Sequence, residues 1–170
     1  MCKRGEASGY TQLYNLYSKE VYNTIYRLVN HTAEAEDILQ ETFLAAFQAI
    51  TGFQNTGGFR AWVKRIAINK SINLIRRKKM KLVELEPTRI TVEEEQAIDE
   101  KAFVFTMEEV RKAIDQLPGG YRTIFQLYAI ENIPQVEIAQ LLGLPNNTVR
   151  IQYFRAKQKI LKTLKEGGIA

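Results

Sequence analysis

The side chains best suited to binding chemistry lie on a helix-turn-helix pattern near the end of the chain. Residues 135–142 have helical spacing, Gly143 permits a left-handed turn, and a second helical pattern follows Pro145. That second pattern exposes side chains able to contact base edges or phosphates in a DNA major groove. They are Arg150, Ile151, Gln152, Phe154, Arg155 and Lys157. Two short helices joined at a glycine also occur in bundles that never touch DNA, so the pattern favours DNA binding without establishing it.

A second candidate for nucleic-acid contact is a basic segment in the first half of the chain. Residues 60–81 contain nine Lys or Arg and no acid, whereas residues 84–109 contain nine acids and only two bases. The whole chain has 170 residues and a formal net charge of +5. A basic excess attracts polyanions, and its concentration in one block indicates that different segments have different partners.

Catalytic chemistry has little support in the sequence. The single cysteine, Cys2, and the single histidine, His31, cannot form a disulfide framework or a Cys/His metal site. Glu36, Asp37 and Glu41 could be imagined as a carboxylate site, but no glycine loop resembles a phosphate-binding loop. We therefore expect no catalytic residue, no metal, no cofactor and no small-molecule substrate.

The expected location is a reducing, cytoplasmic compartment, because a lone cysteine is typical of proteins that are kept reduced. No stretch of the sequence approaches the roughly 18 apolar residues of a spanning helix. We therefore expect no direct insertion into a membrane.

The apolar spacing predicts an all-α protein. Apolar residues recur at three- and four-residue steps over 10–29, which predicts the first helix. A second helix follows, with the side chain of Thr32 as its N-cap. A third helix runs from about 59 to about 77, after a loop that contains paired glycines.

Composition divides the chain into two small helical domains. Residues 8–81 form the first domain, a helical bundle, and residues 107–166 form the second, which carries the helix-turn-helix. Between them, residues 82–106 lose their periodicity and become acidic, as expected of a flexible linker. Trp62 is expected to pack into the core of the first domain.

The chain contains three distinctive segments: residues 35–43, residues 59–69 and, in the helix-turn-helix, residues 148–157. Together they resemble the sigma-70 family, and in particular its extracytoplasmic-function (ECF) group of RNA polymerase sigma factors. Residues 35–43 resemble the helix that binds polymerase, and residues 59–69 resemble the helix that recognises the −10 promoter element. Thr148–Arg150 and Arg155–Lys157 resemble the helix that reads the −35 element. The segments occur in the family's order, and the length suits a chain with only a sigma-2 and a sigma-4 domain. The resemblance implies an alternative sigma factor that directs promoter-specific initiation of transcription.

The resemblance implies that the second helix contacts core RNA polymerase. In the family this helix docks on a coiled coil of the largest polymerase subunit, and the second domain meets the flap region. The corresponding residues are Asp37, Gln40, Glu41, Phe43 and Phe47. Acids beside exposed aromatic rings would suit a basic, amphipathic partner helix. The resemblance also implies an anti-sigma factor, commonly membrane-associated, that clamps the two domains and covers this face.

For promoter DNA the resemblance implies two sites. At the −10 element the melted strand would follow a basic track, with Asn55 and Thr56 as hydrogen-bond partners of an extruded base. Contacts with the strand and its phosphates would come from Arg60, Lys64, Arg65, Asn69, Lys70, Asn73, Arg76 and Arg77. At the −35 element, Thr148 joins the six residues of the helix-turn-helix named above.

Some residues depart from the family's pattern and leave the preferred base sequence open. Asn73 stands where aspartate is usual, Ile151 and Gln152 stand where small polar and basic residues are usual, and Tyr153 replaces an aliphatic residue. An isoleucine cannot donate a hydrogen bond to a base edge, and it would touch a thymine methyl group instead.

The alternative is a stand-alone helix-turn-helix transcriptional regulator whose first domain serves dimerisation or ligand sensing. Such a protein would bind a symmetric operator without polymerase. Because a basic, loop-bearing first domain has no evident purpose in a stand-alone regulator, the sequence favours the sigma factor.

Overall fold

The computed structural model describes residues 6–54, 56–82 and 105–167, and it describes the side chains of all of these except residues 79–82. Every regular element in these ranges is a helix. None of these helices combines the length and the hydropathy that crossing a membrane would require. The prediction of an all-α protein is confirmed.

The chain divides into two compact units, Met1–Leu85 and Glu86–Ala170. The prediction of two helical domains is therefore confirmed at the level of architecture. Most of the predicted linker, 82–106, lies outside the described residues, and the predicted domain limits remain predictions.

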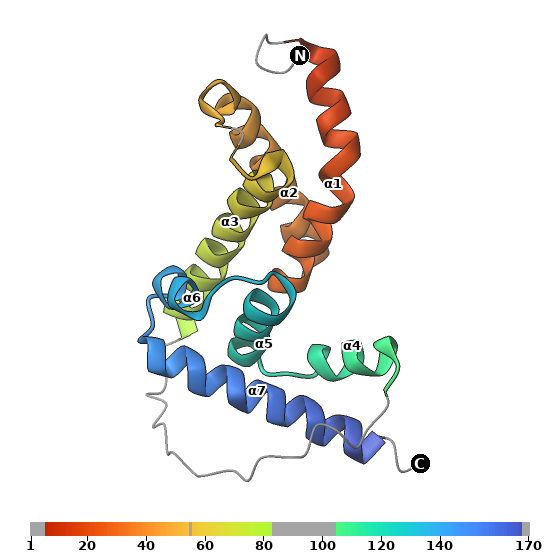
Figure 1. Cartoon of the computed structure of the whole chain (residues 1–170), viewed down its shortest axis with the longest axis vertical. Helices are drawn as coiled ribbons and strands as arrows, with labels where there is room; N and C mark the ends of the chain where they lie inside the picture. Colours follow the sequence, from red (N-terminus) through yellow and green to blue (C-terminus); the bar gives the residue numbers. More distant parts are fainter. Residues whose placement is uncertain (1–5, 55, 83–104, 168–170) are drawn as a thin grey trace. The chain divides into compact units, whose positions relative to one another are not determined.

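The first unit consists of three long helices in its described part (Figure 1). They are α1 (Ala7–Val29), α2 (Thr32–Gln48) and α3 (Gly58–Leu82), with a 3-10 turn, η2, at Ile50–Gly52. Each long helix packs against the other two. The core between them is apolar and consists of Val21, Ile25, Ala35, Ile38, Leu39, Phe43, Ala46, Val63 and Ala67. Burial of each large apolar side chain contributes about 1.5–3 kcal/mol, so this core holds the three helices in place.

Helix α1 begins three residues before the predicted start at residue 10, and it ends at Val29 as predicted. The residue that follows, Asn30, has a φ of 52°. Its backbone N–H donates to the carbonyl of Tyr26 at 2.8 Å. Asparagine tolerates this left-handed conformation better than most residues, which explains why the helix stops there.

The N-cap of α2 is His31, so the prediction that Thr32 caps this helix is wrong. Thr32 is already the first helical residue. The Nδ1 atom of His31 accepts a long hydrogen bond, 3.4 Å, from the backbone N–H of Glu34. An imidazole nitrogen thus takes the place of the expected hydroxyl, and the single histidine of the chain has a local structural contact.

The second unit contains shorter helices that pack on one long helix (Figure 1). They are α4 (Met107–Asp115), α5 (Gly119–Phe125), the π-helical turn η4 (Gln126–Ile130), α6 (Gln135–Leu142) and the long α7 (Asn146–Gly167). Helix α7 contacts α4, α5 and α6. One cluster of its core consists of Ala113, Ile114, Leu117, Ala156, Ile160 and Leu164.

Candidate protein and nucleic-acid interfaces

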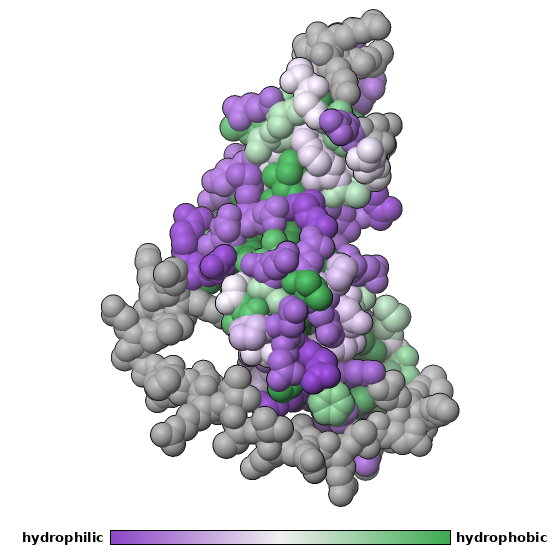
Figure 2. Space-filling model, turned by 60° about the vertical axis from the view of Figure 1, so that its left-hand side comes forward, coloured by the Kyte–Doolittle hydropathy of each residue, from purple (hydrophilic) through white to green (hydrophobic). Residues whose placement is uncertain are grey.

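The outer face of α2 carries a row of exposed side chains. Asp37, Gln40 and Glu41 are exposed, and their spacing of three and four residues places them on one side of the helix. Leu44 continues this row and is 60% exposed. Hydrophilic residues predominate on the face of the molecule shown in Figure 2, with apolar residues in smaller areas between them. We call Asp37, Gln40, Glu41 and Leu44 the outer α2 row.

The two phenylalanines predicted to contact polymerase are placed differently. Phe43 is only 3% exposed and belongs to the core, so the prediction that its ring is exposed to a partner is wrong. The ring meets that of Tyr14 edge to face, with centroids 4.9 Å apart. Phe47 is half-buried, and its ring centroid lies 4.7 Å from that of Tyr10. Because α1 packs on Phe43, Leu44 is the apolar side chain that the outer face presents.

Leu44 was not among the residues predicted from the sequence to contact polymerase, although its spacing from Asp37 indicates its position. Leu44 follows Asp37 by seven residues, which places the two within about 20° of each other around the helix. Phe43 follows Asp37 by six residues and lies about 120° away, on the side that packs against α1.

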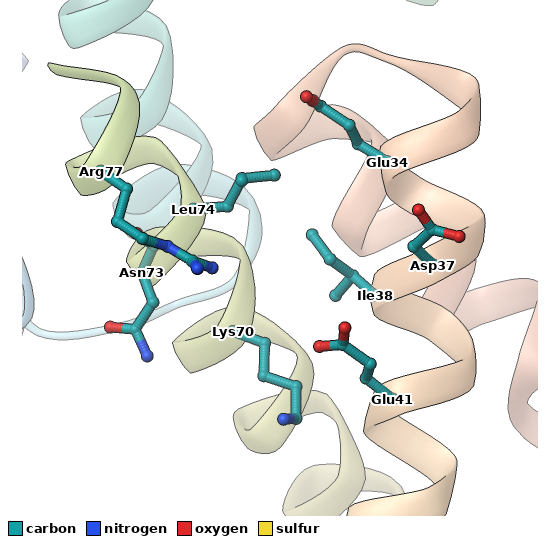
Figure 3. Close-up of a pocket in the computed structure, with 8 residues that line it drawn as sticks. All are labelled: Glu34, Asp37, Ile38, Glu41, Lys70, Asn73, Leu74 and Arg77. Carbon is teal, nitrogen blue, oxygen red and sulfur yellow. The ribbon is translucent and has the colours of Figure 1, made fainter. Parts of the chain in front are cut away.

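A groove of about 240 Å³ lies between α2 and α3 (Figure 3). Carboxylates from α2 line one side, and an amine, an amide and a guanidinium from α3 line the other. They belong to Glu34, Asp37 and Glu41 on α2, and to Lys70, Asn73 and Arg77 on α3. The Nζ atom of Lys78 forms an ion pair with Glu34 at 2.6 Å, which ties the same two helices together. The groove therefore brings residues predicted for polymerase contact close to residues predicted for DNA contact.

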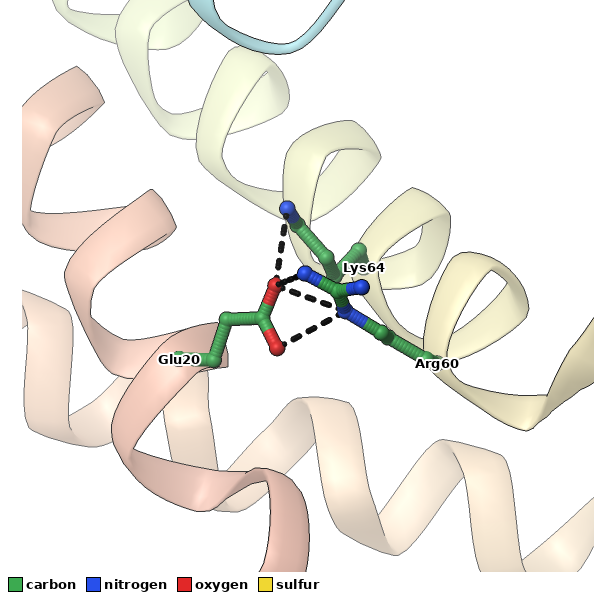
Figure 4. A network of polar contacts seen from close by, with 3 residues as sticks. All are labelled: Glu20, Arg60 and Lys64. Carbon is green, nitrogen blue, oxygen red and sulfur yellow. Dashed lines mark hydrogen bonds and ion pairs between the residues drawn. The ribbon is translucent and has the colours of Figure 1, made fainter.

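A polar network joins the start of α3 to α1 (Figure 4). The Nε atom of Arg60 donates to both carboxylate oxygens of Glu20 at 2.9 Å, and its Nη2 atom donates to Oε1 at 2.6 Å. The Nζ atom of Lys64 donates to the same Oε1 at 3.3 Å. The hydrogen bonds from Arg60 are the main reason that the pKa of Glu20 lies below its ordinary value; Lys64 lowers it further, and partial burial opposes the shift. Glu20 was absent from the sequence-based candidates.

The predicted −10 residues on α3 point in different directions. Arg60 and Lys64 reach toward Glu20 on α1, while Lys70, Asn73 and Arg77 line the groove beside α2. Arg65, Asn69 and Arg76 are exposed at other positions of the helix, and Arg60, Asn73 and Arg77 are exposed as well. The structure thus divides these residues among several sides of the helix and does not gather them on one surface.

The loop before α3 has the tight backbone that its glycines predict. Gly57 and Gly58 have φ angles of 116° and 84°, which L side chains rarely adopt. Thr56 folds back on the loop, because both its backbone N–H and its hydroxyl donate to the carbonyl of Gln54. Asn55, the other predicted base contact, lies outside the described residues.

An aromatic layer supports this loop. The ring centroid of Trp62 lies 4.8 Å from that of Phe53 and 5.7 Å from that of Phe59. Trp62 is half-buried and packs on the core of the first unit, as the sequence predicted. The ring of Phe53 in the loop thus rests on the rings of Trp62 and Phe59 at the start of α3.

The second unit contains the expected helix-turn-helix, formed by α6, Gly143 and the start of α7. Gly143 has a φ of 64° and a ψ of 36°. The backbone N–H of Leu144 donates to the carbonyl of Ala139 at 2.9 Å, and that of Gly143 donates to Gln140 at 3.4 Å. This pair of bonds is typical of a glycine-terminated helix. Val149 is fully buried and anchors α7 against the rest of the unit.

The predicted −35 residues lie at the N-terminal half of α7. Arg150 is exposed and Phe154 is 42% exposed. The others, which are half-buried, are Thr148, Ile151, Gln152, Arg155 and Lys157. The Nη2 atom of Arg150 donates to Oδ1 of Asn147 at 2.9 Å. Asn147 was not among the predicted residues, although it precedes Arg150 by three residues and therefore shares its side of the helix.

Family models match both units of the chain. The model for sigma-70 region 2 matches residues 13–80, and the model for sigma-70 region 4 matches residues 107–160.

Curated relatives match over almost the whole chain. The ECF RNA polymerase sigma factor SigW of Bacillus subtilis is 29% identical, and the match covers 96% of this chain and 93% of SigW. The RNA polymerase sigma-H factor of Pseudomonas aeruginosa is 31% identical, with 95% of this chain and 89% of that protein covered.

Solved structures share the fold. The sigma factor RpoE in complex with the anti-sigma factor NepR from Bartonella quintana matches with a TM-score of 0.57 and 18% identity, over 94% of this chain and 98% of that one. CnrH in complex with the cytosolic domain of CnrY matches with a TM-score of 0.54 and 24% identity, over 97% and 93% of the two chains.

Region 2 followed by region 4 defines a helical promoter-recognition protein that works with RNA polymerase. The chain belongs to the sigma-70 family of RNA polymerase sigma factors, in its extracytoplasmic-function group. It is an alternative sigma factor, and sigma factors are not themselves enzymes. The region 2 match over the first unit favours this function over that of a stand-alone helix-turn-helix regulator.

Proposed function

We propose that the outer α2 row is the surface that docks on the coiled coil of the largest polymerase subunit. Two exposed carboxylates, Asp37 and Glu41, lie in one row with the amide of Gln40 and with Leu44. A basic amphipathic helix would pair with the acids and cover the leucine. The observation that carries this proposal is the 60% exposure of Leu44 beside the two carboxylates.

The test adds the purified chain to sigma-free core polymerase and maps transcription starts on genomic DNA from the chain's own host. Wild-type chain should form a complex and initiate at defined sites, whereas Asp37→Arg and Gln40→Ala should lose both properties. Glu36→Arg is the matched control, because Glu36 is also exposed but lies about 100° from Asp37 around the helix. Loss of complex formation in Glu36→Arg alone would show that another face of α2 makes the contact.

A different result would restore the stand-alone regulator. In that case the chain would not bind core polymerase. It would bind a symmetric DNA duplex tightly on its own, with an affinity that falls steeply as the salt concentration rises.

At the −10 element we propose that the loop before α3 holds an extruded base and that α3 contacts the melted strand. Support comes from the glycine-shaped loop on its aromatic base and from the exposed Arg65, Asn69 and Arg76 on the helix that follows. Aromatic and basic groups of this kind are what single-stranded nucleic acid requires. Arg65→Ala and Asn69→Ala should reduce strand opening at the promoter, measured by permanganate reactivity, and leave the complex with core polymerase intact.

At the −35 element we propose that the N-terminal half of α7 enters the major groove. Arg150 and Phe154 are its most exposed predicted contacts, and the hydrogen bond that the guanidinium of Arg150 donates to Oδ1 of Asn147 holds the Arg150 side chain in place. Arg150→Ala should weaken binding to the cognate duplex by about tenfold or more and relax the base preference at one position. Asn147→Ala should give a smaller loss in the same assay.

We further propose that the second domain meets the polymerase flap region and that an anti-sigma factor competes for the polymerase-docking face. In one of the solved structures described above the sigma factor RpoE is bound to the anti-sigma factor NepR, and in the other CnrH is bound to the cytosolic domain of CnrY. The first complex motivates the second proposal. An anti-sigma factor added in excess should release the chain from core polymerase; a stable ternary complex would contradict this. Catalysis belongs to the polymerase. We also propose that the chain acts in the cytoplasm.

A further inference from the structure

We propose that Glu20 on α1 controls how much positive charge the start of α3 offers to the −10 strand. Glu20 acts through Arg60 and Lys64, so it is a positioning residue and does not itself contact DNA. The proposal rests on the proposed DNA role of these two bases.

The geometry places one carboxylate against both bases. Three hydrogen bonds from Arg60 reach Glu20, the shortest at 2.6 Å, and Lys64 reaches the same oxygen at 3.3 Å (Figure 4). Arg60 and Lys64 are separated by four residues, one turn of α3, which allows a single carboxylate to meet both. Figure 4 shows Glu20 projecting from α1 toward the two bases.

The charge balance follows from this arrangement. The three groups together carry a net charge of about +1, where the two bases alone would carry +2. The side chain of Arg60 is 65% exposed, that of Glu20 is 34% exposed and that of Lys64 is 21% exposed. The network is thus open to solvent, and a phosphate could reach Arg60. A phosphate that approaches the Nε and Nη2 donors would have to compete with the carboxylate, because both already donate to Glu20.

A merely structural ion pair would predict something different. If Glu20 only tied α1 to α3, its removal would change stability and leave the number of phosphates contacted unchanged. If it masks positive charge, its removal increases the number of counterions that DNA releases on binding, and the salt dependence becomes steeper.

The test measures how the full chain binds a fluorescein-labelled oligothymidylate by anisotropy, over about 50 to 200 mM salt. Glu20→Gln removes the charge and keeps an oxygen acceptor. The slope of log affinity against log salt should become more negative by about 0.7 for each phosphate newly contacted. Glu6→Gln is the matched control, because Glu6 is exposed and precedes the same helix about 21 Å from Glu20 along its axis.

A second variant covers the case in which Glu20→Gln does not fold. Arg60→Lys keeps the positive charge but cannot make the two-pronged contact with Glu20, so its slope should steepen as well. Fluorescence of Trp62, the single tryptophan of the chain, reports whether the first unit of each variant is folded.

The proposal is overturned if the slope of folded Glu20→Gln equals that of wild type, or if Arg60→Gln added to Glu20→Gln leaves the steeper slope unchanged. In the first case only the role of Glu20 fails. In the second, the assignment of Arg60 to the strand fails with it. Neither result affects the polymerase-docking test with Asp37→Arg, so failure of this inference is distinguishable from failure of the sigma factor's docking face.

Discussion

The ring of Phe43 on α2 packs edge to face on the ring of Tyr14 on α1, with centroids 4.9 Å apart. This contact removes Phe43 from solvent, while the next residue, Leu44, stays 60% exposed. A single step along α2 therefore separates a core side chain from one that a partner can reach.

This relationship predicts opposite effects for two neighbouring truncations. Phe43→Ala should lower the free energy of unfolding of the first unit by about 3–5 kcal/mol, because it leaves a cavity in the core. Leu44→Ala should change that free energy by less than about 0.5 kcal/mol. It should instead weaken binding to core polymerase by about tenfold, the expected effect of losing an apolar contact at the centre of an interface. Urea unfolding followed by Trp62 fluorescence and titration with core polymerase measure the two effects.

Leu16→Ala is the control for this prediction. Leu16 on α1 is 70% exposed and lies outside the outer α2 row, so its truncation should leave polymerase affinity unchanged. Equal losses of polymerase affinity in Leu16→Ala and Leu44→Ala would contradict a specific contact between Leu44 and polymerase.

The network of Glu20 predicts a dependence of stability on pH. Hydrogen bonds from Arg60 hold the pKa of the Glu20 carboxyl below its ordinary value. A group with a lowered pKa in the folded state stabilises the fold above its unfolded pKa, and this contribution is lost as the pH falls through the folded pKa. Glu20→Gln should therefore be less stable than wild type at pH 7, and the difference should shrink as the pH falls below about 4.3. Urea unfolding of the first unit at several pH values measures it, and a difference independent of pH would contradict the prediction.

The start of α4 offers a test of local stability in the second unit. The hydroxyl of Thr106 accepts a hydrogen bond from the backbone N–H of Glu109 at 3.3 Å, and the Glu109 carboxylate accepts one from the backbone N–H of Thr106 at 2.8 Å. Thr106→Ala removes the cap and should destabilise α4 by about 1 kcal/mol. Thr106→Ser keeps the hydroxyl and should behave like wild type. Hydrogen exchange of the α4 amides reads out this effect, and equal exchange rates in Thr106→Ala and wild type would count against it.

Local patterns were sufficient for much of the fold. The steps of three and four residues in α1 predicted its apolar side, and Val21, Ile25 and Leu28 are indeed buried. Leu16 fits the same spacing, but it is 70% exposed, so the prediction failed for that residue. The turn at Gly143 was predictable because a glycine between two helical patterns has few other functions. Periodicity and turn chemistry depend on neighbours in sequence, which is why these predictions needed no tertiary information.

The remaining features depend on contacts between distant residues. Whether Phe43 or Leu44 is buried depends on where α1 lies, since an amphipathic pattern alone does not say which edge of its apolar side is covered. The bond between Glu20 and Arg60 joins residues 40 positions apart. From the sequence alone, the bases of α3 were predicted to form one DNA-binding surface. The packing of the three helices instead directs some of them toward α1, some toward α2 and some toward solvent.

The backbone of Gly143 leads to the last prediction. Its φ of 64° lies in the left-handed region, which costs most L residues about 1–2 kcal/mol. Gly143→Ala should destabilise the second unit by about that amount and displace α7 from α6, so that affinity for the −35 duplex falls while polymerase docking through α2 is retained. Gly143→Asn is the matched control, because Asn30 and Asn132 adopt φ angles of 52° and 56° in this same chain. Asparagine at this position should thus preserve most of the stability and the DNA affinity. If alanine and asparagine prove equally harmful in thermal unfolding and duplex binding, the requirement at Gly143 is for a missing side chain and not for a left-handed backbone.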